Sequence, residues 1–140
     1  QAQPNPDLLA LLKKPDLQAI VICPSNPYVS IDPILAVPGI RDALKACQVP
    51  IVAVSPIVGG QAVKGPLAKM LAEQHLPVSA LTVAEFYQDL LSGFVLDTAD
   101  AALATALQIP VHTANTVMIS LQDREDLAQT VLEFARELRG

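Results

Sequence analysis

The chain has 140 residues, of which 51% are hydrophobic and 16% charged, a composition that fits one folded domain and excludes a disordered segment. Nine lysines and arginines against fourteen acidic residues give a net charge of −5, which argues against a nucleic-acid partner. No apolar run is long enough for a membrane helix and the first residues lack a signal-peptide pattern, so we expect no membrane partner and a cytoplasmic location.

Strand and helix patterns alternate along the chain. In chain order we predict a helix over Asn5–Lys14, a strand over Ala19–Cys23, a helical segment within Asp32–Cys47 that breaks at Pro38-Gly39, a strand over Pro50–Ser55, helices over Pro66–His75 and Thr82–Leu91, a strand over Phe94–Thr98, a short helix over Asp100–Leu107, a strand over Pro110–Thr113 and a helix over Asp123–Leu138. The strands are rich in Val and Ile and mostly continuous, as parallel strands covered on both faces are. This alternation predicts a single α/β domain, residues 1–140, with helices on both faces of a parallel sheet.

Polar clusters follow each predicted strand. In open α/β sheets, ligands bind beyond the carboxyl ends of the strands, and the carboxyl ends of parallel strands share one rim of the sheet. We therefore expect one rim to carry the clusters Ser25-Asn26, Ser55 to Pro66, Asp97 to Asp100, and Asn115-Thr116.

The loop after the second strand points most directly to a ligand. Gly59-Gly60 would let the backbone approach a ligand closely, and Lys64 is the only charged residue of the loop. Gly65-Pro66 then opens a predicted helix, whose free N–H groups favour an anion. The order differs from a Walker loop, in which the lysine follows the second glycine. The alternatives are an anion site, or a turn with a helix cap and a solvated lysine.

The other clusters also leave two interpretations open. Ser25 and Asn26 lie between two prolines, and they either contact a ligand or form a turn that satisfies its own backbone. Asp97 and Asp100 either bind a metal or act as a base, or they cap the following helix, which is the more common role.

The remaining polar residues give weaker signals. Asn115-Thr116 either contacts a ligand or ends a strand, while Cys23 and Cys47 have the character of small buried residues. Two cysteines and two isolated histidines cannot build a zinc site, and no catalytic residue is assigned.

Several motifs in a fixed order resemble the CofD family, 2-phospho-L-lactate transferase. They are Pro24-Ser25-Asn26-Pro27, Ser55-Pro56-Ile57-Val58-Gly59-Gly60, Lys64-Gly65-Pro66, Gly93-Phe94-Val95-Leu96-Asp97 and Asn115-Thr116-Val117-Met118. The resemblance covers nearly the whole chain. It departs at Cys23 and Asp32, where the family usually has Gly, and at Asn115, where it often has Asp.

The resemblance implies a Rossmann-like fold and a reaction. A phospholactyl or phosphoenolpyruvyl group would pass from a guanosine-diphosphate-linked donor to the deazaflavin FO, with release of GMP, in coenzyme F-420 biosynthesis. Mg²⁺ is implied as the cofactor. Motifs and strand ends together single out nine candidate substrate-binding residues: Ser25, Asn26, Ser55, Gly59, Gly60, Lys64, Gly65, Asn115 and Thr116.

The resemblance also implies that part of the machinery lies elsewhere. The family's N-terminal phosphate loop and its acidic residues for Mg²⁺ and FO have no counterpart here, so we expect the C-terminal half of a longer enzyme, inactive alone. Its partners would be the N-terminal half, the two substrates and, as an open case, a second copy of itself. Alternatives are a nucleotide-sugar-binding or regulatory relative without catalysis, and an interaction domain that docks the missing half.

Overall fold

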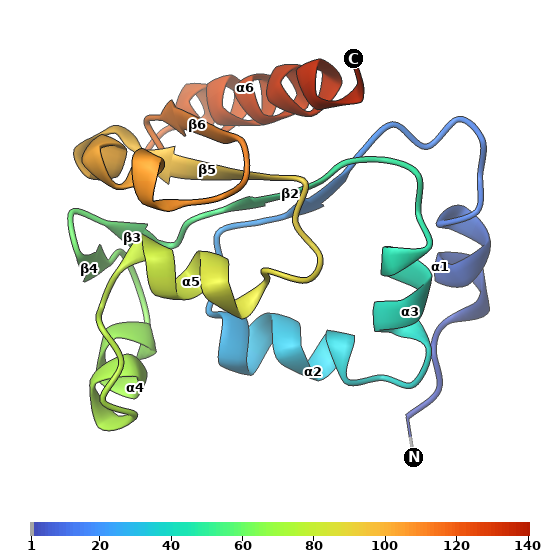
Figure 1. Ribbon diagram of the computed structural model, residues 1–140, viewed down its shortest axis with the longest axis horizontal. Helices are drawn as coiled ribbons and strands as arrows, with labels where there is room; N and C mark the ends of the chain where they lie inside the picture. Colours follow the sequence, from blue (N-terminus) through green and yellow to red (C-terminus); the bar gives the residue numbers. More distant parts are fainter. Residues whose placement is uncertain (1) are drawn as a thin grey trace.

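The computed structural model describes residues 2–140 (Figure 1). In chain order the elements are α1 (Pro6–Leu11), β1 (Ile20–Ile22), the π-helical turn η1 (Pro27–Ile31), α2 (Asp32–Leu35), α3 (Ile40–Lys45), β2 (Ile51–Val54), β3 (Ile57–Val58), β4 (Gln61–Ala62), α4 (Leu67–Glu73), α5 (Ala80–Phe86), β5 (Gly93–Asp97), the 3₁₀ helix η2 (Thr98–Ala106), β6 (Val111–Ala114) and α6 (Leu121–Arg139).

Four strands form one sheet in the order β1-β2-β5-β6, and every neighbouring pair is parallel. The sheet confirms the predicted α/β class, with a Rossmann-like arrangement of helices on both faces. Because the strands are parallel, the four predicted strand-end clusters begin at the same rim.

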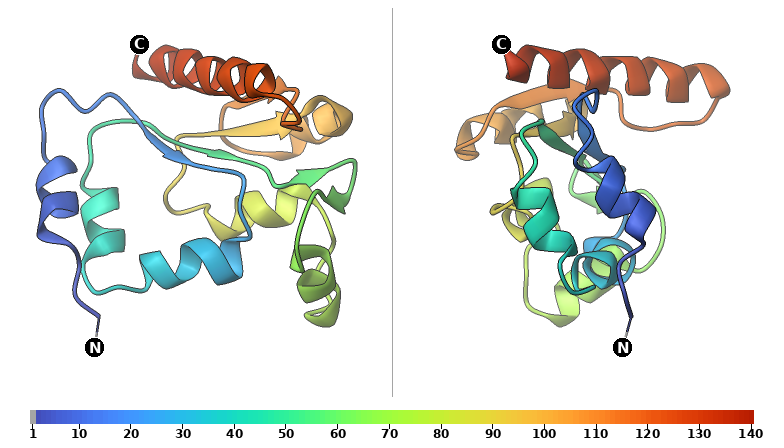
Figure 2. Two further views of the ribbon diagram at one scale, coloured as in Figure 1. Left: turned by 180° about the vertical axis from the view of Figure 1, so that it is seen from behind. Right: turned by 90° about the vertical axis from the view of Figure 1, so that its right-hand side faces the viewer.

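The two faces of the sheet are covered unequally. The elements that connect the strands lie on one face, and α6 alone packs on the other, across β2, β5 and β6 (Figures 1 and 2). Successive side chains of a strand point to opposite faces. Val52 and Val95 accordingly join the core under α6, while Ala53 and Phe94 join the larger core on the connecting side.

Gly93 sets how closely α6 approaches the sheet. A Cβ atom at this position would lie 2.7 Å from Leu138 Cδ1 and 2.8 Å from Phe134 Cε1. Only a residue without a side chain fits where β5 begins, because the end of α6 occupies that space.

Most predicted helices are confirmed, but the helix predicted over Thr82–Leu91 needs correction at both ends, since α5 runs over Ala80–Phe86 and so ends five residues before Leu91. The helix predicted over Asn5–Lys14 is α1, and Asn5 caps it by accepting the N–H of Asp7 at 2.8 Å. Thr82 does not begin a helix: Ser79 caps α5, and Thr82 Oγ1 instead donates to the carbonyl of Pro77 at 2.8 Å. The helix therefore starts two residues earlier than predicted.

Two short strands were not predicted. β3 and β4 form an antiparallel hairpin whose two-residue turn is Gly59-Gly60, with φ of +57° and +72°. This turn geometry needs positive φ at both positions, which glycine adopts without strain. Each strand has only two residues, too few for a periodic pattern in the sequence.

The cysteine prediction is half wrong. Cys23 follows β1 at the edge of the sheet and is exposed, whereas Cys47 is half-buried. None of the helices in residues 2–140 is both long and apolar enough to cross a membrane.

Candidate functional site

A cavity of about 450 Å³ lies at the carboxyl rim, where the segments after β1, β2 and β6 meet the start of α4. Its lining is partly apolar and partly polar, and comprises Pro24, Ser25, Asn26, Val29, Ser30, Ser55, Pro56, Val63, Lys64, Gly65, Pro66, Leu67, Thr116 and Met118. We call this the rim cavity. Its walls come from three separate strand ends, so the parallel sheet is what assembles it.

The rim cavity collects most of the candidate substrate-binding residues. Six of the nine line it: Ser25, Asn26, Ser55, Lys64, Gly65 and Thr116. Gly59, Gly60 and Asn115 do not. The two glycines form the hairpin turn, and the N–H of Gly59 donates to Asp100 Oδ2 at 2.9 Å. Asn115 lies outside the lining, and its Oδ1 accepts the N–H of Val117 at 3.4 Å.

Lys64 is the one charged side chain among the lining residues. It is exposed, and the ion pairs found within residues 2–140 do not include it. Arg41 and Lys45 both bind Asp89, at 2.6 and 2.7 Å, and neither lines the cavity. Among the residues that line the cavity, Lys64 is therefore the one side chain whose charge could attract an anion.

Ser55 and Asn26 are held by local hydrogen bonds. Ser55 is buried, and its hydroxyl both donates to the carbonyl and accepts the N–H of Ile57 at 3.1 Å. Asn26 Oδ1 accepts the N–H of Tyr28 at 3.0 Å, which is the turn-forming alternative, and Nδ2 lies 3.4 Å from Met70 Sδ. A thioether is a weak acceptor, so the Asn26 amide keeps donor capacity for a ligand.

Asp97 fixes the wall formed by Thr116. Its Oδ1 accepts the N–H of Ala99 at 2.9 Å, as predicted for a cap, and its Oδ2 accepts both the N–H (2.8 Å) and Oγ1 (3.0 Å) of Thr116. Burial acts to raise the pKa of Asp97, but hydrogen bonds from Ala99 and Thr116 outweigh it and hold the pKa below its ordinary value. The contact across strands was not predicted, because it depends on the β5–β6 register.

The carboxylates at this rim do not fit a Mg²⁺ site. Both oxygens of Asp97 already accept hydrogen bonds, and Asp100 holds the hairpin through Gly59. Within residues 2–140, no three His, Cys, Asp or Glu side chains come together as metal ligands.

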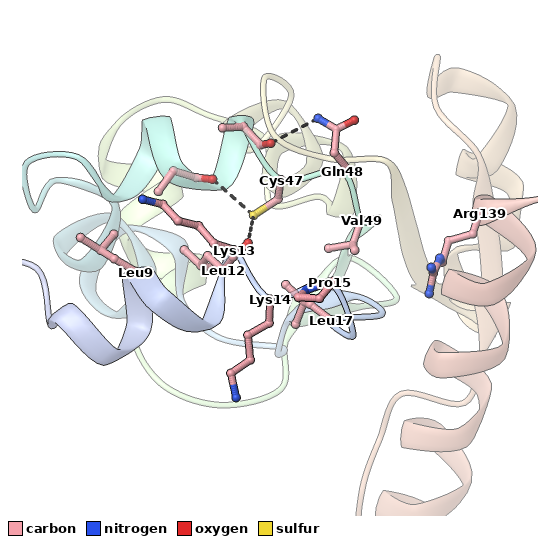
Figure 3. Close-up of a pocket in the computed structure, with 12 residues that line it drawn as sticks. Leu9, Leu12, Lys13, Lys14, Pro15, Leu17, Cys47, Gln48, Val49 and Arg139 are labelled. Carbon is pink, nitrogen blue, oxygen red and sulfur yellow. Dashed lines mark hydrogen bonds between the residues drawn. The ribbon is translucent and has the colours of Figure 1, made fainter.

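A second cavity of about 440 Å³ lies at the opposite end of the sheet, before β1 and β2 (Figure 3). Leu9, Leu12, Leu17 and Val49 give it an apolar lining, and Lys13, Lys14 and Arg139 lie around it. The Cys47 thiol donates to the carbonyls of Leu12 and Ala43, both at 3.3 Å, and burial raises its pKa. We call this the amino-end cavity; none of the nine candidate residues lines it.

Comparison with known proteins gives a consistent result. Residues 1–136 match the family described as 2-phospho-L-lactate transferase CofD. A 2-phospho-L-lactate transferase of Methanocaldococcus jannaschii is 39% identical over 137 residues, which are 98% of this chain and 43% of the relative. A phosphoenolpyruvate transferase of Kitasatospora aureofaciens is 39% identical over 142 residues, covering 99% of this chain and 44% of the relative.

A 2-phospho-L-lactate transferase of Methanosarcina barkeri is 40% identical over 135 residues, covering 94% of this chain and 42% of the relative. The chain thus spans less than half the length of these curated relatives. The match nevertheless runs through every strand and the whole rim cavity. The chain belongs to the CofD family of 2-phospho-L-lactate transferases.

Proposed function

We propose that this chain is part of a transferase that moves a phospholactyl or phosphoenolpyruvyl group from a guanosine-diphosphate-linked donor to FO in coenzyme F-420 biosynthesis. Relatives named for each of the two groups match it equally well, at 39% identity. The observation that carries the proposal is the rim cavity, in which the lone cation Lys64 faces hydroxyl and amide groups from neighbouring strand ends.

Different lining residues bind the donor phosphates and the ring of FO. Lys64 holds the phosphates of the donor, and Ser25 and Asn26 donate hydrogen bonds to the same group. Val29, Val63 and Met118 supply apolar surface for the flat ring of FO.

The transfer itself follows from that arrangement. The terminal hydroxyl of FO attacks the β-phosphorus of the donor and a new P–O bond forms. The bond between this phosphorus and the oxygen that bridges it to the α-phosphorus breaks, GMP leaves with that oxygen, and the hydroxyl proton passes to solvent. Lys64 stabilises the negative charge on the transferring phosphoryl oxygens. We assign no catalytic base.

We further propose that Mg²⁺, the remaining contacts to FO and the rest of the donor site are supplied by the other part of a full-length transferase. The rim carboxylates serve as internal hydrogen-bond acceptors, which supports this division. The 140-residue chain alone should therefore show no transfer of the phospholactyl group to FO, as measured by FO consumption in the presence of donor and Mg²⁺.

Lys64→Ala tests the proposal in a full-length transferase. Donor affinity should fall by about 1–3 kcal/mol, because a charged hydrogen bond to phosphate is lost. The melting temperature should hardly change, because an exposed lysine contributes less than about 1 kcal/mol to stability. Lys69→Ala is the control: Lys69 lies on α4, pairs with Glu73 at 3.7 Å and does not line the cavity. Equal donor affinity in the two variants would refute the role of Lys64.

A second candidate is a nucleotide-sugar-binding relative without catalysis. The internal satisfaction of Asp97 favours it, because no free carboxylate lines the rim cavity. The two are separated by one measurement on the full-length protein: donor binding without any transfer to FO supports the non-catalytic relative.

A further inference from the structure

One edge of the sheet is open at β1. Within residues 2–140, β1 pairs with β2 alone. The N–H of Ile20 donates to the carbonyl of Pro50 at 2.9 Å, on the β2 side. Alternate residues of a parallel strand direct their backbone groups to opposite sides, so the N–H and C=O of Val21 face the open edge.

The side chain of Val21 is also left without cover. Val21 is in register with Val52, which is 0% exposed beneath α6, whereas Val21 is 37% exposed. On α6, Leu132 is 53% exposed and lines a narrow groove with Ala19, which lies two residues before Val21 and packs against the same core under α6. We call the β1 edge together with Val21 and Leu132 the β1 seam.

The β1 seam has little that protects a solvent-facing edge. Natural edge strands are very short, or they carry charged side chains, proline or a bulge that blocks pairing with another strand. β1 is short, but its three residues, Ile-Val-Ile, include no charge or proline and pair with β2 without a bulge. β6, the strand at the other edge of the sheet, contains His112 and Thr113 and is partly covered by α6.

The connections show how the sheet would continue. From β1 to β6 the strands follow in chain order, and every connecting segment lies on the face opposite α6. Right-handed crossovers produce this arrangement when each new strand is added at the same edge of the sheet. Growth in the other direction, beyond β1, would place the connecting helices on the α6 face, where Val21 and Leu132 are uncovered.

We propose that the β1 seam is the surface on which the remaining part of a full-length transferase docks. That part adds a strand parallel to β1 and packs a helix beside α6, over Val21 and Leu132. The occupant is identified by length, since this chain covers only 43% of the M. jannaschii relative and more than half of that protein is available to fill the seam. The inference rests on family membership and does not depend on the proposed reaction.

Hydrogen exchange provides the first test. The amides of Val21 and Cys23, which face away from β2, are compared between the 140-residue chain and a full-length transferase that contains it. They should exchange roughly tenfold or more slowly in the full-length protein, because an added strand accepts the outward N–H groups. Equal exchange in the two proteins would overturn the proposal. Protection that instead rises with the concentration of the 140-residue chain, and is no greater in the full-length protein, would show a second copy as the occupant.

Paired substitutions provide the second test. In the full-length protein Val21→Asp should lower the melting temperature by about 5 °C or more, because a carboxylate would be buried at the seam. Leu76→Asp is the matched control, since Leu76 is 38% exposed in the segment between α4 and α5. In the 140-residue chain both changes should shift the melting temperature by about 2 °C or less. Equal effects of the two variants in the full-length protein would contradict docking at the β1 seam.

Discussion

The rim cavity and the amino-end cavity lie at opposite ends of one sheet. Helices begin near the rim cavity and end near the amino-end cavity. η1, α4 and η2 begin near the rim cavity, so their free N–H groups lie at that end. α1, α3 and α6 end near the amino-end cavity and bring their terminal carbonyls there. The two cavities are similar in volume but differ in what they can bind.

The side chains follow this polarity. At the rim, carboxylates and hydroxyls accept backbone N–H groups, as Asp97 does for Ala99 and Thr116. At the other end, a thiol donates to carbonyls, and Arg139 lies in the last turn of α6. A parallel sheet therefore sorts donors and acceptors between its two ends, and this polarity supports the anion site that we propose at the rim.

Asp97→Ala should break the rim end of this comparison. It removes four hydrogen bonds to a charged acceptor, one each from Thr98 and Ala99 and two from Thr116, and leaves the buried N–H of Thr116 without a partner, at a cost of about 2–4 kcal/mol. Urea unfolding of the 140-residue chain measures the loss. At the amino end, Cys47→Ala should cost about 1 kcal/mol or less, because a thiol is a weak donor. Equal losses for the two variants would show that the ends are not built differently.

Acid should weaken the rim in the same way. Because the pKa of Asp97 is lowered in the folded chain, its ionised form adds stability above the unfolded pKa of about 3.9. That contribution disappears as the pH falls through the folded pKa. Unfolding curves between neutral pH and pH values below about 4 should show the decline, and Asp97→Asn should make it shallower. If the stability of Asp97→Asn declined at acid pH as steeply as that of the unchanged chain, this role of Asp97 would be contradicted.

Gly60→Ala should loosen the hairpin beside the rim cavity. Its φ of +72° is a left-handed conformation, which costs alanine about 1–2 kcal/mol. A new Cβ would meet no atom closer than Val78 O at 3.8 Å, so the cost is conformational and not steric. Gly60→Asn is the control, because asparagine tolerates this conformation better and should lose less stability by thermal unfolding. Equal losses would point to a steric cause.

The strands of the sheet were predicted well because a continuous Val- and Ile-rich run is typical of a buried strand. β1, β2, β5 and β6 all fall within the predicted ranges to within one residue. The hairpin could not be predicted, since each of its strands has two residues and its glycine pair also fits a ligand loop. The helix was predicted to begin at Thr82 because Thr82 and Glu85 have the spacing of a capping box, whereas the residue that caps it, Ser79, lies three residues earlier.

The site was predictable only as far as strand ends determine it. Ser25, Lys64 and Thr116 share the rim cavity because parallel strands end together. Asn115 precedes Thr116 by one residue yet lies outside the lining, since neighbouring residues leaving a strand point in opposite directions. The hydrogen bond between Asp97 and Thr116 joins the end of β5 to the segment after β6, and the register of these two strands cannot be predicted from either segment alone.

Tyr87→Phe should have the smallest effect, and it probes the core between the two ends. Tyr87 is 2% exposed, and its hydroxyl is the only buried side-chain nitrogen or oxygen in residues 2–140 without a hydrogen-bond partner. Burial, and then the charge of Asp32, raises its pKa, so the hydroxyl stays neutral. Removing an unpaired buried hydroxyl should leave stability unchanged or raise it by up to about 1 kcal/mol. The ring centroids of Tyr87 and Phe86 lie 5.1 Å apart. Tyr87→Ala removes this packing and should cost about 3–5 kcal/mol of stability. A clear loss of stability in Tyr87→Phe would show that the hydroxyl has a partner in solution, and that the polar groups of this chain are not confined to the two ends of the sheet.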